Sequence, residues 1–155
     1  AMEIVPEPGF VIKTRNAKTQ SKVFINVCCS SHIRPLSRKT QLADDGTEQE
    51  GISVPLSVGP PRSEKDKKGV ACVVFDVVVH PSVVNDVKSD STGGMRHFVV
   101  DIAISRIEEK YKTQLDRRYK LPKLAYKGEP TKQRIRKAQA PVIEEIHEGP
   151  QLNAD

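Results

Sequence analysis

The sequence lacks most of the side-chain patterns on which enzymes depend. It has no tryptophan, and aromatic residues make up only 5% of its 155 positions. It contains no glycine-rich phosphate loop followed by lysine, no GxSxG and no HExxH, and none of its four histidines accompanies a serine or cysteine nucleophile in a recognisable motif. We therefore expect no catalytic residues and no cofactor.

Cysteines and long apolar runs are scarce as well. The three cysteines, Cys28, Cys29 and Cys72, form no CxxC pair and no His/Cys cluster with metal-ligand spacing, so we expect no metal site but small buried side chains in a reducing compartment. No apolar run approaches the ~20 residues that span a bilayer, and no signal pattern opens the chain. These features favour a soluble, intracellular protein without membrane contact.

Charge is the first informative feature that is present. The formal net charge is +5, and residues 110–137 carry eleven basic side chains against Asp116 and Glu129. Such a concentration of positive charge indicates an acidic partner: nucleic acid, a phosphorylated peptide or anionic lipid. Nucleic acid is the weaker choice because no helix-turn-helix, zinc finger or RNP-type motif accompanies Tyr119 and Tyr126, which could stack on bases.

Two β-branched and aromatic runs, residues 10–13 and 22–28, predict a β-hairpin around the polar turn 14–21. Folding this hairpin brings Lys13 close to Lys22. Like charges that face each other across a strand pair are destabilising, so the arrangement favours an anion bound between them. The alternative is a pair of solvated loop lysines.

The rest of the pattern predicts a single α+β domain with a mixed or antiparallel sheet flanked by helices. The longest β run, 70–80, is apolar on both faces except at Asp76 and predicts a central strand. The acid at that position is either satisfied by backbone donors or a nearby lysine, or poised for chemistry. Helices are expected at 82–88 and 95–112, and an edge strand at 119–128.

The remaining segments set the expected organisation of the chain. Residues 1–8 are interpreted as a flexible lead-in, 9–137 as the domain, 30–51 as a mobile insertion within it and 138–155 as a disordered tail. Residues 62–69 are expected to form a charged turn. Pro55 limits 52–58 to an edge strand or an extended segment.

Further lysines stand at the junctions between predicted elements: Lys68 before the central strand, and Lys120 and Lys123 after the long helix. If they converge with Lys13 and Lys22, they form a pocket for a phosphate with acidic neighbours. Each charge-assisted contact would contribute ~1.5–3 kcal/mol. Each lysine could equally be a solvated surface residue.

Four blocks resemble the PIH-domain family, which is named for proteins that interact with the ninety-kilodalton heat-shock chaperone. They are PGFVIKT at 8–14, KVFINVC at 22–28, FDVVVHP at 75–81 and IEEKY at 107–111. The resemblance spans about residues 7–136. LDRR at 115–118 and YKGEP at 126–130, together with DVVVHP, look most like the kintoun branch, whose members are cytoplasmic factors for preassembly of axonemal dynein arms.

The resemblance implies a non-enzymatic α+β domain that binds short acidic motifs carrying a casein-kinase-type phosphoserine. It implies partners in the heat-shock chaperone and its AAA+ ATPase machinery, with axonemal dynein chains as clients. The family's two phosphate-binding lysines fall on Lys13 and Lys22, and Lys68, Lys120 and Lys123 fall on supporting basic positions. One supporting arginine of the family falls on Ala125, and the turn between Lys13 and Lys22 is longer than in the phosphopeptide-binding members.

Three interpretations follow from the sequence. The first is a co-chaperone adaptor domain in which Lys13 and Lys22 hold a phosphate while Lys68, Lys120 and Lys123 hold flanking carboxylates. The second is a scaffold whose basic face binds acidic tails without needing phosphate. The third is RNA binding through residues 110–137.

Overall fold

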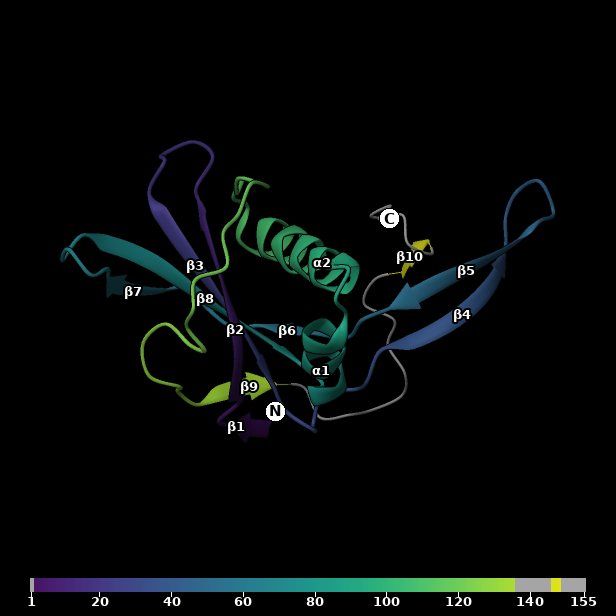
Figure 1. Cartoon of the computed structure of the whole chain (residues 1–155), viewed down its shortest axis with the longest axis horizontal. Helices are drawn as coiled ribbons and strands as arrows, with labels where there is room; N and C mark the ends of the chain where they lie inside the picture. The colour runs from purple at the N-terminus through teal and green to yellow at the C-terminus, as the bar shows by residue number, and fades with distance from the viewer. Residues whose placement is uncertain (1, 136–145, 149–155) are drawn as a thin grey trace.

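The computed structural model describes residues 2–135 and, as backbone, 146–148, and it has the expected α+β architecture. Its main sheet has five strands in the order β2-β3-β8-β6, with β7 also paired to β8 (Figure 1). The strands are β2 (Glu7–Arg15), β3 (Lys22–Cys29), β6 (Ser57–Val58), β7 (Arg62–Lys65) and β8 (Ala71–Val79). The sheet is mixed, because β3 and β8 run parallel while the other pairs are antiparallel.

The predicted hairpin and central strand are confirmed. β2 pairs with β3 over nearly its whole length, with a β-bulge between Glu7 and Phe10, and β8 lies between β3 and the two short strands. Successive side chains of a strand point to opposite faces. The pairing of Ile12 with Ile25 therefore fixes one face of the sheet as apolar, and the pairing of Lys13 with Phe24 places both on the other face.

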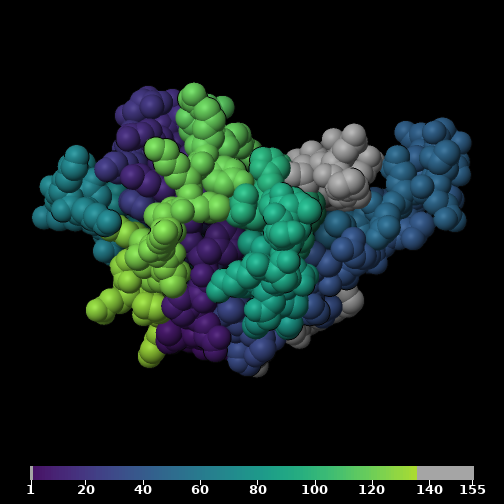
Figure 2. All heavy atoms as spheres, viewed as in Figure 1, coloured from purple at the N-terminus to yellow at the C-terminus, as the bar shows by residue number. Residues whose placement is uncertain are grey.

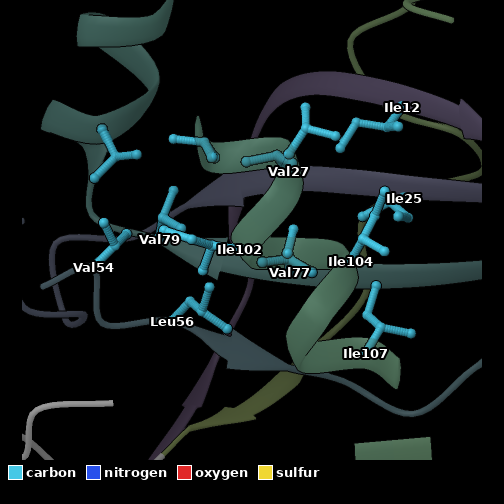
Figure 3. Close-up of a cluster of buried hydrophobic side chains, with 14 of the residues drawn as sticks. Ile12, Ile25, Val27, Val54, Leu56, Val77, Val79, Ile102, Ile104 and Ile107 are labelled. Carbon is cyan, nitrogen blue, oxygen red and sulfur yellow. The ribbon is translucent and has the colours of Figure 1, made fainter. Parts of the chain in front are cut away.

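Two helices, α1 (Pro81–Ser89) and α2 (Gly94–Tyr111), cover the apolar face, as the sequence predicted. His80 caps α1, since its Nδ1 accepts a hydrogen bond from the Ser82 amide, and Pro81 occupies the first turn where no N–H is needed. Figure 3 shows how Ile102, Ile104 and Ile107 of α2 lie over this face of the sheet. The labelled side chains beneath them are Ile12, Ile25, Val27, Val77 and Val79, with Val54 and Leu56 at the margin.

The segment 113–135, called the C-terminal arm below, passes from the helical face of the sheet to the opposite face. Leu115 packs in the core beneath the helices, whereas Tyr126 and Ile135 pack with Cys28 on the other face. At its end, β9 (Gln133–Ile135) pairs with β1 (Met2–Ile4). Met2–Ile4, within the segment 1–8 expected as a flexible lead-in, thus forms a paired strand.

The edge strand expected at 119–128 is wrong. Only Lys120 forms a bridge to the sheet, with Lys13 of β2. Pro122 has no N–H to continue a ladder, and its carbonyl accepts a hydrogen bond from the Leu124 amide at 2.8 Å, which turns the chain away. The charged turn expected at 62–69 is also partly wrong, because β7 occupies its first half with alternately half-buried and exposed side chains.

The region expected as an insertion contains a second hairpin, β4 (Ser37–Leu42) with β5 (Glu48–Ser53), which projects away from the main sheet (Figure 1). All six β4 side chains are exposed, so no apolar alternation marks the strand in the sequence. The mobility expected of residues 30–51 stays a prediction. The tail expected at 138–155 lies outside the described residues except for β10 (Ile146–Glu148), whose backbone pairs with β5.

The cysteines agree with the analysis of composition. Cys28, Cys29 and Cys72 are free thiols and buried, and burial raises the pKa of each. Among the described residues, no helix has both the length and the apolar character needed to cross a membrane.

Candidate functional site

Four cations from two parts of the chain meet beside the β2–β3 turn, and we call Lys13, Arg15, Lys22 and Lys120 the basic cluster. The strand register sets Arg15 opposite Lys22, two positions along from the pair of Lys13 with Phe24, so all four of these side chains share one face. Lys120 joins them from the C-terminal arm. Its backbone exchanges two hydrogen bonds with Lys13, of 2.8 and 2.9 Å.

The pKa of Lys13 reports the crowding of positive charge. It lies below the ordinary lysine value, because burial disfavours the ammonium and because Lys22, Lys120 and Arg15 repel it, in that order of size. Only Asp66 acts in the opposite direction. An anion bound among these side chains would relieve the repulsion, so the cluster has the electrostatics of an anion site.

Asp66, in the turn between β7 and β8, places a carboxylate beside this charge. Its Oδ2 accepts a hydrogen bond from Lys22 Nζ at 2.7 Å, and its Oδ1 accepts from the amides of Lys68 and Val70 at 2.9 and 2.8 Å. The Lys22 hydrogen bond, followed by the Val70 amide bond, lowers the pKa of Asp66 to about 2. Asp66 is therefore ionised at neutral pH and paired with one of the two hairpin lysines.

The five lysines singled out in the sequence fall into two groups. Lys13, Lys22 and Lys120 come together in the basic cluster. Lys68 lies in the turn that Asp66 ties to Lys22, with its side chain exposed. Lys123 is exposed beyond Pro122, and within the described part of the chain no recorded side-chain contact links it to the others. In Figure 1 the β2–β3 turn, the β7–β8 turn and the start of the C-terminal arm lie toward the same end of the sheet.

Comparison with known proteins identifies the fold that carries this cluster. The family model for the PIH1 N-terminal domain matches residues 1–143. The chain belongs to this family. Protein kintoun of Anopheles gambiae is 37% identical over 132 residues, covering 84% of this chain and 15% of that protein. PIH1 domain-containing protein 1 of Homo sapiens is 34% identical over 150 residues, covering 93% of this chain and 50% of that protein.

The PIH1 fold is also found by structure. The N-terminal domain of yeast PIH1p superposes with a TM-score of 0.65 at 24% identity, covering 84% of this chain and 88% of that one. The resemblance drawn from the sequence blocks and the α+β class are thereby confirmed. The chain spans half or less of the length of the two relatives named above.

Sequence reasoning missed two members of the site in this PIH1 domain, Arg15 and Lys127. Lys127 Nζ lies 5.1 Å from the centroid of the Phe24 ring, on the face that carries the basic cluster, and donates to the Lys65 carbonyl at 2.8 Å. Arg15 could have been found from the register, since a hairpin that opposes Lys13 to Phe24 opposes Arg15 to Lys22. Lys127 could not have been found in this way, because its position near Phe24 depends on the path of the C-terminal arm.

A buried polar network fixes that path. Asp76 of β8 is fully buried, and its carboxylate accepts hydrogen bonds from Tyr126 Oη and Gln133 Nε2, both at 2.7 Å, and from Arg62 and Asn26. Asn26 in turn bonds both the amide and the carbonyl of Lys127, at 2.7 and 3.1 Å. Burial, followed by the hydrogen bond to Asp76, raises the pKa of Tyr126. The network thus joins three strands of the sheet to the arm.

Asp76 is therefore a structural acid, although its partners differ from those expected. The sequence suggested backbone donors or a lysine, and the structure supplies four side chains instead. No set of three or more metal-ligating side chains occurs among the described residues. A cavity of about 410 Å³ lies beside Cys29, the last residue of β3, and Pro81, the first residue of α1, away from the basic cluster.

Proposed function

We propose that this domain is a binding module of a co-chaperone adaptor, and that its basic cluster takes acidic, phosphorylated peptide motifs of partner proteins. The observation that supports the proposal most directly is the convergence of Lys13, Lys22 and Lys120 from two parts of the chain, with the pKa of Lys13 lowered by burial and by the other two. A phosphoserine carries about −1.5 to −2 charges at neutral pH and three acceptor oxygens, which suits a group of point-charge ammonium donors.

Within this proposal the lysines have different roles. Lys13 and Lys22 hold the phosphate on the face of the hairpin that their side chains share. Lys120 extends the site along the arm, and the exposed side chains of Lys68 and Lys123 meet carboxylates that flank the phosphoserine. The ligand class that fits is an Asp-pSer-Asp-Asp type of motif, which a casein-kinase-type enzyme generates. The domain works by binding and performs no chemical step.

The cellular role belongs to the same proposal. One relative is named kintoun and another PIH1 domain-containing protein 1, and the resemblance to that family implies assembly work with the heat-shock chaperone and its AAA+ ATPase machinery. Axonemal dynein chains are the proposed clients, and the cytoplasm is the proposed location. The domain would bring a phosphorylated partner to the chaperone while the rest of the protein holds the client.

A titration with an Asp-pSer-Asp-Asp peptide and its unphosphorylated twin, at two salt concentrations, tests the proposal. We expect the phosphorylated form to bind more tightly and its affinity to fall as salt screens the cluster. Replacing Lys13→Ala together with Lys22→Ala should abolish that preference in a protein that stays folded. The matched control replaces Lys39→Ala and Lys88→Ala, two exposed lysines on β4 and α1, and should bind as the wild type does.

The outcome also separates the other interpretations. If a charge-matched Glu-rich peptide binds as tightly as the phosphopeptide, the domain binds acidic tails in general and does not recognise phosphate. Tighter binding of single-stranded RNA than of the phosphopeptide would move the function to the basic residues 110–137. Unchanged phosphopeptide affinity in the double hairpin variant would remove the basic cluster as the site.

A further inference from the structure

We propose that Asp66 is a built-in competitor of the anionic ligand: it occupies Lys22 in the free domain and thereby lowers the affinity of the basic cluster for anions. This inference rests on the proposed function and concerns the same site. It assigns a role in affinity to a carboxylate that lies outside the set of basic residues.

The geometry gives the first step. Asp66 Oδ2 lies 2.7 Å from Lys22 Nζ, and the two side chains are 6% and 24% exposed, so this contact is sheltered compared with most surface ion pairs. An ammonium group has three N–H donors, and Asp66 uses one of those on Lys22. A ligand must therefore share Lys22 with a negative charge that is already present.

The second step is that Asp66 cannot move aside easily. Its Oδ1 is held by the amides of Lys68 and Val70, and its own amide donates to the Val70 carbonyl at 2.8 Å. Gly69 completes this turn with φ +79°, a conformation that glycine adopts without strain. Both carboxylate oxygens are thus committed, one to the turn and one to Lys22, and the turn sets the position of the charge.

The third step concerns the charge that a ligand meets. Lys13 has no carboxylate within ion-pair distance among the described residues, and of the charges that shift its pKa only Asp66 opposes the three cations. Asp66 therefore removes about one of the four positive charges of the basic cluster. A ligand with a single carboxylate therefore gains little binding free energy at the cluster. A phosphate with acidic neighbours gains more, because it can contact Lys13, Lys120 and the remaining N–H donors of Lys22.

The test is Asp66→Asn, read by titration with the Asp-pSer-Asp-Asp peptide, its unphosphorylated twin and inorganic phosphate. Asparagine keeps a carbonyl oxygen for the two turn amides but loses the charge that holds Lys22. We expect the phosphopeptide to bind about three- to tenfold more tightly, as for removal of one nearby repulsive charge in a solvated site. The affinity of the unphosphorylated peptide should increase less, because the repulsion that the variant removes scales with the charge of the ligand.

Two further variants make the experiment decisive. Asp66→Ser also accepts from turn amides but brings no new amide donor toward the ligand, so a gain shared by both variants comes from the lost carboxylate. Asp45→Asn is the matched control: Asp45 likewise accepts from a turn amide, that of Thr47 at 2.9 Å, but in the projecting β4–β5 hairpin (Figure 1). It changes the net charge equally and should leave every affinity as in the wild type.

Weaker binding in the Asp66 variants would overturn the inference, since it would mean that Asp66 positions Lys22 for the ligand. Affinities unchanged from the wild type, or a gain equal to that of Asp45→Asn, would overturn it as well. If the wild type binds neither peptide, the proposed function fails by itself. The inorganic phosphate titration still decides the role of Asp66 in that case, because it needs only the basic cluster.

Discussion

Individual residues contribute most to the stability of this domain where a polar side chain is buried away from water. Asp76 is the extreme case, with a fully buried carboxylate and four side-chain donors that come from β3, β7 and the arm. A buried carboxylate is tolerated only when it is paired and hydrogen-bonded. The network therefore stabilises the fold chiefly by specifying one arrangement of its members, since the same volume could be filled by apolar groups.

Replacing Asp76→Ala should destabilise the domain strongly. It removes the buried counter-ion of Arg62, which keeps its 4.0 Å ion pair with Glu64, and it removes the acceptor of the 2.7 Å hydrogen bonds from Tyr126 and Gln133. We expect a loss of roughly 3 kcal/mol, toward the low end for a broken buried pair, because the Arg62 side chain keeps 21% exposure. Urea denaturation measures this loss. Asp44→Ala, at an exposed position, should stay within about 0.5 kcal/mol of the wild type. A loss below 1 kcal/mol in Asp76→Ala would contradict this account of the network.

The sequence could flag Asp76 but could not name its partners. A single acid in an apolar run is a clear local signal for a buried polar group. Its donors, however, lie 14 to 57 positions away along the chain. Which of the many polar residues reaches it depends on the path of the arm, and no local periodicity encodes that path.

Among the elements, the C-terminal arm does most to assemble the site. It supplies Lys120 and Lys127, yet it has almost no regular structure and is held by a few specific contacts. In Figure 2 the arm, drawn in green, lies against the purple N-terminal hairpin beside α2. One of its main attachments is Asn26, whose side-chain amide binds the backbone of Lys127 in both directions, as a neighbouring strand would.

We expect Asn26→Ala to loosen the arm and to weaken ligand binding severalfold, although Asn26 lies outside the basic cluster. The variant removes both contacts to Lys127 and one donor to Asp76, so the position of Lys120 is less restricted. Amide hydrogen exchange should accelerate at Lys127 and its neighbours while β2 and α2 stay protected. Ser63→Ala, at an exposed position of β7, provides the control. Unaltered exchange along the arm would show that Asn26 is not needed to hold it.

The elements that were predicted correctly share a property: their side chains have an apolar face toward one core. That holds for β2, β3, β8, α1 and α2. Alternation or helical periodicity marks such elements directly. The hairpin β4–β5 was missed because its first strand is exposed throughout, and β7 was read as a turn because charged residues occupy it. Backbone pairing holds these strands in place, and the sequence pattern carries no signal of it.

At the scale of the whole molecule, the candidate site exists only because separate segments meet. The proximity of Lys13 and Lys22 was predictable from the hairpin alone, although the register sets Lys13 opposite Phe24 and Lys22 opposite Arg15, so the two lysines do not face each other directly. Lys120 and Asp66 arrive from other segments, so the charge balance of the cluster is a property of the tertiary fold. The pH dependence of binding follows from that balance.

Phosphopeptide affinity should fall on the alkaline side earlier than an ordinary lysine would allow. The pKa of Lys13 lies below 10.5, first because of burial and then because of Lys22 and the other cations, so Lys13 loses its charge at a lower pH than an ordinary lysine does. A bound phosphate favours the ammonium, and binding must therefore be accompanied by proton uptake in this range. On the acid side, affinity should fall near pH 6, as the phosphate takes up its second proton.

Loss of the Lys13 proton has opposite effects on binding and on the stability of the fold. The expected loss of affinity at high pH can therefore be distinguished from alkaline unfolding. Because the folded state holds the Lys13 proton less tightly than the unfolded state, the contribution of this group to the free energy of unfolding increases as pH rises through the lowered pKa. Binding should weaken while the fold gains stability. Lys13→Arg keeps the charge to higher pH, since arginine stays protonated, and should shift the alkaline limb upward. Identical alkaline limbs in the wild type and in Lys13→Arg would show that Lys13 does not contact the phosphate.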